Sequence, residues 1–96
     1  MGTGYTHAAG LLPAERNVID LLAGGGSRWW TLEDIIASLE PLQGRRESAA
    51  AIARLLHAGH LTRFAGRTAG IYGLTTLGEL VAGDLRRERL EAAHAA

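Results

Sequence analysis

The spacing of apolar and polar residues along the chain predicts four helices and three short strands. Apolar residues recur at three- and four-residue intervals, as on one face of a helix, in the stretches from about 11 to 24, 31 to 41, 46 to 58 and 76 onward. Strand-type patterns rich in aromatic and β-branched residues occur at 28–31, 61–65 and 71–74. The predicted order is therefore helix, strand, helix, helix, strand, strand, helix.

The predicted helices have recognisable start and stop signals. Pro13 suits a first helical turn, and the glycine run 24–26 ends the first helix. Thr31 and Thr76 are each followed three residues later by an acid, which approximates a capping box at the start of the second and the last helix. Pro41 closes the second helix.

The third predicted helix, from about Arg46 to Ala58, has a core side and an exposed side. At about 100° per residue, the positions within about 60° of Ile52 form the expected buried stripe, namely Ser48, Ala49, Leu55, Leu56 and Gly59. The positions more than about 120° away are Arg46, Glu47, Ala50 and Arg54. Three of these four are charged, and the fourth is a small alanine that allows close approach of a partner.

The stretch after Gly59 predicts a β-hairpin. The strand patterns at 61–65 and 71–74 enclose a glycine-bounded loop at 66–70, with Arg67 and Thr68 at its tip. The alternation of the first strand places Leu61 and Phe64 on opposite faces.

The neutral total charge hides an uneven distribution. Residues 1–43 contain two arginines and five acids, residues 44–78 five arginines and one acid, and residues 79–96 three arginines and four acids. The basic segment coincides with the third helix and the hairpin, which favours a nucleic-acid-binding surface. The alternative is an ordinary solvated surface, on which Arg45 and Arg46 pair with Glu40 or Glu47.

Length and composition narrow the class of protein. Ninety-six residues suffice for one domain, in which we expect residues 1–10 to be flexible. The chain has no cysteine, which excludes disulfides and thiol chemistry and fits a cytoplasmic location. No apolar run approaches the roughly 20 residues that span a bilayer, and we expect neither a signal peptide nor a membrane partner.

Other candidate sites have simpler explanations. His57 and His60 are spaced like a metal pair, but no cysteine or nearby carboxylate completes a ligand shell, so we expect no metal and no cofactor. Trp29 and Trp30 suit a stacking platform or, more simply, one buried core ring beside one half-exposed ring. No catalytic constellation is apparent, which argues against an enzyme.

The order of elements is that of a winged helix-turn-helix domain, mainly α with a small antiparallel β-sheet (α-β-α-α-β-β-α). The chain resembles the MarR and PadR groups of bacterial transcriptional regulators in two motifs. Residues 52–61, Ile-Ala-Arg-Leu-Leu-His-Ala-Gly-His-Leu, look like the end of their recognition helix, and 72–78, Tyr-Gly-Leu-Thr-Thr-Leu-Gly, are similar to their exit from the wing. The resemblance covers about residues 12 to 85. It implies a domain at 11–85, with 86–96 as a helix end or tail.

The resemblance implies sequence-specific binding of double-stranded DNA, with the third helix in the major groove and the 66–70 hairpin tip as the wing. Matched to this pattern, the outward residues Arg46, Glu47, Ala50 and Arg54 would face the bases, Arg67 would be the wing contact, and Arg45, Ser48 and Thr68 would meet phosphates. It also implies a homodimer through the C-terminal helix, although an N-terminal dimer helix is not recognisable and the wing is short. The alternative function is a winged-helix adaptor that binds protein and not DNA.

Overall fold

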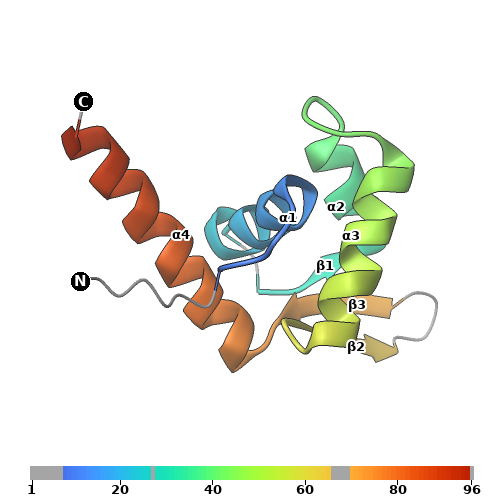
Figure 1. Cartoon of the computed structure of the whole chain (residues 1–96). Helices are drawn as coiled ribbons and strands as arrows, with labels where there is room; N and C mark the ends of the chain where they lie inside the picture. Colours follow the sequence, from blue (N-terminus) through green and yellow to red (C-terminus); the bar gives the residue numbers. More distant parts are fainter. Residues whose placement is uncertain (1–7, 27, 66–69, 96) are drawn as a thin grey trace.

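Four helices and a three-stranded sheet follow one another in the predicted order (Figure 1). The computed structural model describes residues 8–26, 28–65 and 70–95. The helices are α1 (Pro13–Gly24), α2 (Leu32–Leu39), α3 (Arg45–Ala58) and α4 (Thr76–Ala95), and the strands are β1 (Trp30–Thr31), β2 (Leu61–Ala65) and β3 (Gly70–Leu74). The sheet is antiparallel in the order β1-β3-β2. The predicted fold class, mainly helical with a small antiparallel sheet, is confirmed.

Helix α1 is the central element of the core. It packs against α2, α3 and α4, and Figure 1 shows it between α3 and α4. The largest fully buried apolar side chains are Val18, Ile19, Ile35, Leu55 and Val81, which come from all four helices. Each such side chain contributes about 1.5–3 kcal/mol by leaving water. The sheet closes the core with Leu61 and Tyr72.

The helix ends follow the predicted signals, except that the residue capping α4 differs by one position. Thr31 caps α2, because its hydroxyl accepts the Asp34 N–H at 3.1 Å. The predicted cap Thr76 is wrong by one residue, since Thr75 accepts the Gly78 N–H at 3.1 Å. Helix α2 ends at Leu39, before Pro41, and the chain then turns tightly, with the Gln43 N–H donating to the Leu39 carbonyl at 2.9 Å.

Two glycines join α3 to the rest of the fold. Gly59 ends α3 with a φ of 88°, a left-handed conformation that glycine adopts without steric cost. Gly78, in the first turn of α4, lies against the carbonyl of His60, and a Cβ at this position would overlap that oxygen. Thr75 completes the joint by donating its hydroxyl to the Gly59 carbonyl at 2.6 Å. Within the 72–78 motif, Thr75 therefore bonds the start of α4 to the end of α3, and Gly78 allows the two to pack closely.

The distal part of α4 is held to α1 by charge. Arg16 pairs with Glu88, and Arg89 pairs with Asp20 at 2.7 Å. The segment at 86–96, expected to be a helix end or a tail, belongs to α4 as far as Ala95. At the other end of the chain, residues 8–10 of the segment expected to be flexible form a turn and Ala8 is buried in the core, while residues 1–7 lie outside the described residues.

Candidate nucleic-acid interface

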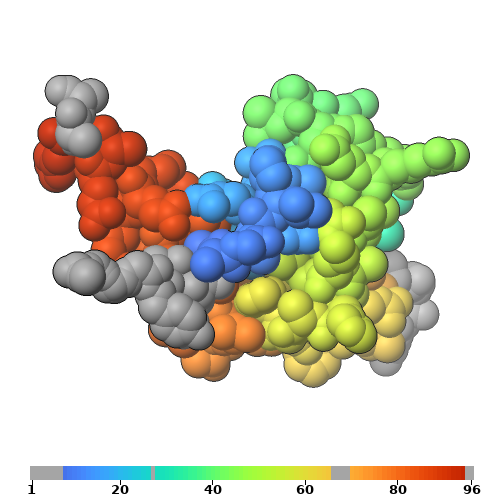
Figure 2. Space-filling model, in the orientation of Figure 1, coloured from blue at the N-terminus to red at the C-terminus, as the bar shows by residue number. Residues whose placement is uncertain are grey.

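The outer side of α3 forms a narrow exposed surface. Its buried side consists of Ser48, Ala51, Ile52 and Leu55. At about 100° per residue, the side opposite to these residues carries a row of exposed residues, Arg46, Ala50, Ala53 and His57. We call these four residues the α3 face. In Figure 2, α3 lies along the surface between the α2–α3 turn and strand β2, with α1 beside it.

The true buried side is rotated from the predicted one. Ala49 was expected in the core but is exposed, whereas Ala51, which the prediction omitted, is fully buried. Leu56 is only half-buried, and Gly59 is exposed. The predicted outward residues Arg46, Glu47 and Ala50 are exposed as expected. The rotation moves the centre of the exposed side toward Arg46 and away from Arg54.

A buried glutamine fixes the orientation of α3. The side chain of Gln43, in the α2–α3 turn, donates to the Ser48 hydroxyl at 3.1 Å and to the Ala14 carbonyl of α1 at 3.3 Å. Its oxygen accepts from the Asn17 amide, also on α1, at 2.8 Å. The turn, α1 and α3 are thereby joined through one side chain. Sequence reasoning missed Gln43, although a polar residue two positions after Pro41 in a helix-turn-helix turn was an available signal.

The Ser48 side chain does not reach the surface. The residue is fully buried and accepts the hydrogen bond from Gln43. The expectation that Ser48 contacts a phosphate is wrong for this reason, while its placement on the buried stripe is confirmed.

Arg45 forms an ion pair with an acid of the preceding helix. Its guanidinium bonds the Glu33 carboxylate at 2.6 Å, and both side chains are well exposed. Neither Glu40 nor Glu47, the partners considered from the sequence, holds it. The hydrogen bond to Glu33 raises the pKa of Arg45, which stays a cation at every physiological pH.

Arg54 lies at the edge of the exposed side and pairs with a buried acid. Its Nε donates to Glu15 of α1. Burial alone would raise the pKa of Glu15, but hydrogen bonds from Arg54 and from the Leu12 N–H, together with the charge of Arg54 and a smaller contribution from His60, outweigh it and lower the pKa. Glu15 is therefore a carboxylate at neutral pH.

The wing is described only at its base. Its expected tip residues Arg67 and Thr68 lie outside the described residues. Below the tip, the exposed Arg63 on β2 lies opposite Tyr72 on β3, with its guanidinium carbon 5.9 Å from the centre of the Tyr72 ring. Arg63 was counted in the basic segment but not named as a contact residue.

The two tryptophans serve different faces of the sheet. Trp30 packs against the core, and Trp29 meets Phe64 edge-on, with ring centres 4.9 Å apart. Phe64 is 53% exposed on the face opposite the buried Leu61, as the alternation predicted. Both tryptophans are half-buried, so the expectation of one buried core ring beside one half-exposed ring is confirmed only in that Trp30 packs against the core. The outer face of the sheet consequently presents an aromatic patch.

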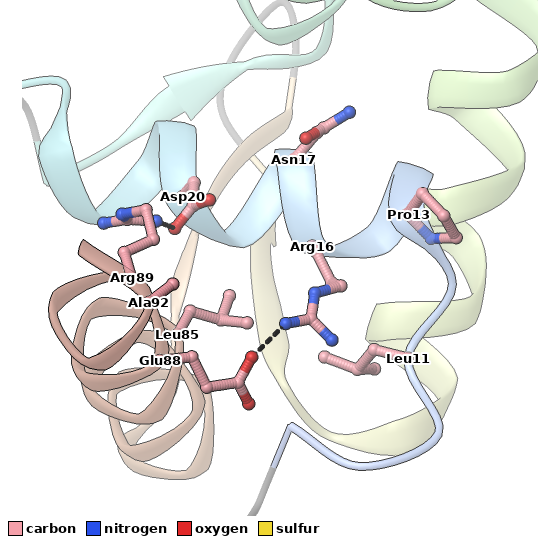
Figure 3. A pocket seen from close by; sticks show the side chains of 9 residues that line it. All are labelled: Leu11, Pro13, Arg16, Asn17, Asp20, Leu85, Glu88, Arg89 and Ala92. Atoms are coloured by element: carbon pink, nitrogen blue, oxygen red, sulfur yellow. Dashed lines mark hydrogen bonds and ion pairs between the residues drawn. The ribbon is translucent and has the colours of Figure 1, made fainter. Parts of the chain in front are cut away.

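A cavity of about 540 Å³ lies between α1 and α4, away from α3. Figure 3 shows the Arg16–Glu88 and Arg89–Asp20 ion pairs at this cavity, with Leu11 and Leu85 beside them. Both arginines of the cavity are thus neutralised by acids of the same chain. Among the described residues, no group of three potential metal ligands occurs, and none of the helices is long and apolar enough to cross a membrane.

Comparison with known proteins identifies the fold. No protein-family model and no curated protein sequence matches the chain. Among solved structures, it is similar to a MarR family transcription regulator, with 18% identity and a TM-score of 0.76 over 90% of this chain and 56% of the other. The adhesin competence repressor AdcR of Streptococcus pyogenes matches with 17% identity and a TM-score of 0.71, over 90% of this chain and 63% of AdcR.

A third similar structure, TubR of Bacillus thuringiensis serovar israelensis, is bound to 24 base pairs of tubC. It shares 13% identity with a TM-score of 0.65, over 78% of this chain and 80% of TubR. The chain spans just over half of the MarR family protein and less than two thirds of AdcR. Together with the helix-turn-helix and the hairpin described above, these likenesses show that the chain has the winged helix-turn-helix fold of MarR-type and other transcription regulators.

Proposed function

We propose that this protein is a transcriptional regulator that binds double-stranded DNA in a sequence-specific manner, with α3 in the major groove. The observation that supports this most is the α3 face, a narrow exposed ridge with Arg46 near its start and small alanines behind it. Such a ridge allows an α-helix to approach base edges closely. The Gln43 hydrogen bonds hold it at a defined angle. The known DNA complex of TubR, which has the same fold, is consistent with this use.

The contacts divide into base readers and phosphate partners. Arg46 projects from the centre of the exposed side and would fork onto guanine, with Glu47 beside it as an acceptor for cytosine and Ala50 allowing close approach. Arg45, near the N-terminal end of α3, is assigned to the phosphates. Arg67 and Thr68 of the hairpin tip are proposed from the sequence as the wing contacts. The same proposal makes the protein a binding protein and not an enzyme.

We further propose that the protein acts as a homodimer. Helix α4 exposes Leu77, Leu80 and Leu90, apolar side chains that a second copy would cover. Two α3 helices related by a twofold axis would meet half-sites about one DNA turn apart. A regulator of this kind works where the DNA is, and we place it in the cytoplasm.

Titration of a generic fluorescent duplex at low and moderate salt tests the proposal. Arg45 and Arg67 would give two arginine–phosphate contacts per protomer and four per dimer, which corresponds to a slope of log K against log salt near roughly −3.6 and a loss of roughly a hundredfold between about 50 and 200 mM salt. Size-exclusion chromatography with light scattering reports the oligomeric state. Weak binding that does not change with salt would reject the DNA-binding function.

The aromatic patch on the sheet favours one alternative, an adaptor that binds another protein. Phe64 and Trp29 offer the kind of exposed aromatic surface that anchors protein interfaces. The neutral total charge also fits such a role. The titration separates the two functions, because the adaptor predicts little DNA binding at either salt concentration.

A further inference from the structure

Arg54 is held by a carboxylate that is itself immobile. Glu15 lies in the first turn of α1, and only 8% of its side chain is exposed. One of its oxygens accepts the Leu12 N–H at 3.0 Å, and the other accepts the Nε–H of Arg54 from α3. Both carboxylate oxygens are therefore engaged, one by the helix start and one by the guanidinium.

The guanidinium remains available although it is paired. An arginine has five N–H donors, and a bond at Nε leaves the two Nη groups at the far end for another acceptor. The Arg54 side chain is 46% exposed. Measured from the centre of the buried side, Arg54 lies about 110° around α3, on the flank beside α1, whereas Arg46 lies about 170° away. A group on the flank of a helix in the major groove faces the sugar–phosphate backbone, while a group at the centre faces base edges.

The structure thus assigns a positioning role to Glu15: it fixes Arg54 so that the free Nη groups meet a DNA phosphate at the edge of the groove. This inference rests on the proposed DNA binding. It also changes the role of Arg54 from the base reader implied by the resemblance to a backbone contact. Because Glu15 immobilises Arg54 before binding, the DNA complex avoids the entropy cost of ordering a long side chain, which corresponds to a roughly two- to tenfold gain in affinity.

The sign of the effect separates positioning from simple charge. Glu15 is an anion beside a DNA-binding surface, so its charge alone opposes binding, and its removal should tighten the complex. If Glu15 positions Arg54, its removal should weaken the complex instead. Glu15→Gln offers one acceptor oxygen where the carboxylate offers two, so that either Leu12 or Arg54 loses its partner. Glu15→Asp keeps the charge but shortens the reach.

We would measure the affinity of the full chain for a short fluorescent duplex of mixed sequence by anisotropy at low salt. The proteins are wild type, E15Q, E15D, R54A and the double variant E15Q/R54A, each checked for its helical circular dichroism. Asp20→Asn is the charge control, because it removes an acid from α1 that pairs with Arg89 and not with α3. E15Q and E15D should each bind roughly two- to tenfold more weakly than wild type. D20N should bind as well as wild type or slightly better.

The double variant provides the readout that a purely structural role would not give. Once Arg54 is absent there is nothing to position, so E15Q/R54A should bind as R54A does. The inference is overturned if E15Q binds as tightly as wild type or more tightly, or if E15Q weakens binding equally in both backgrounds. E15D decides the matter should E15Q lose its fold. A wild-type protein without salt-dependent binding would instead reject the proposed function itself.

Discussion

Replacement of Gln43 by leucine should destabilise the protein by about 3 kcal/mol, because this side chain makes three hydrogen bonds in a buried place. Each bond contributes about 0.5–1.5 kcal/mol, and the partners left behind add a cost where they are buried. The Ser48 hydroxyl is one such partner, since the residue is fully shielded from water. For a domain of this size, 1 kcal/mol corresponds to about 4–8 °C in melting temperature, so we expect a decrease of about 12–24 °C.

Thermal and urea unfolding followed by circular dichroism would measure this loss. Leu42→Gln is the matched control, because Leu42 is the adjacent residue of the same turn and is 69% exposed, so its change should stay within about 0.5 kcal/mol. In a double-mutant cycle, Ser48→Ala should cost less in the Gln43→Leu background than in wild type, since the orphaned hydroxyl is then removed. A Gln43→Leu protein as stable as wild type would refute the argument that this amide locks the turn.

Four further substitutions test other parts of the structure. Gly78→Ala should destabilise the protein by about 1–3 kcal/mol, because the new Cβ overlaps the His60 carbonyl oxygen, and urea unfolding would detect this. Arg46→Ala should weaken binding to a selected site by about 1–3 kcal/mol more than to a generic duplex, whereas Arg67→Ala should weaken both equally and reduce the salt slope by about 1; equal effects in anisotropy titrations would contradict this division. The lowered pKa of Glu15 means that its carboxylate stabilises the fold above the ordinary glutamate pKa of about 4.3 and that this contribution is lost as the pH falls through the lower folded value. The stability difference between wild type and Glu15→Gln should thus be full at neutral pH and shrink in acid, and a difference that grows in acid would show the opposite sign.

The fold could be predicted because its signals are local. The glycine run at 24–26, the Thr31 cap and the turn at Gly59 each act within a few residues, and the strand patterns on either side of 66–70 left one reasonable pairing. The 72–78 motif was recognised as a resemblance, and the structure gives its physical reason, since Thr75 and Gly78 pack against the end of α3. The shifted cap at Thr75 was a choice between two adjacent threonines that the local pattern alone does not make.

Contacts between elements distant in the sequence could not be predicted in the same way. Arg54 and Glu15 are 39 residues apart, and Gln43 and Asn17 are 26 apart. No periodicity within one helix indicates which acid of another helix will face it. The same applies to Arg45, whose partner Glu33 lies on the preceding helix and was not among the acids considered. Long-range ion pairs therefore decide which arginines are free to contact bases in the proposed complex, although the number of arginines was evident from the composition.

The exposed side of α3 lies about 50° around the helix from its predicted position, and the alanine content of the helix explains the difference. Alanine is apolar but small, and it is found in cores and on surfaces alike. The four alanines at 49, 50, 51 and 53 therefore do not indicate which side of the helix is buried. Among the larger apolar residues of α3, only Ile52 and Leu55 are buried. Ala51 extends the buried side on one flank of Ile52, whereas Leu56, which was expected in the core, lies on the other flank. The corrected rotation removes Arg54 from the centre of the surface and replaces it with Ala53 and His57. The proposed DNA-binding surface therefore has fewer charges at its centre than the number of arginines implies, and its sequence preference should depend mainly on Arg46.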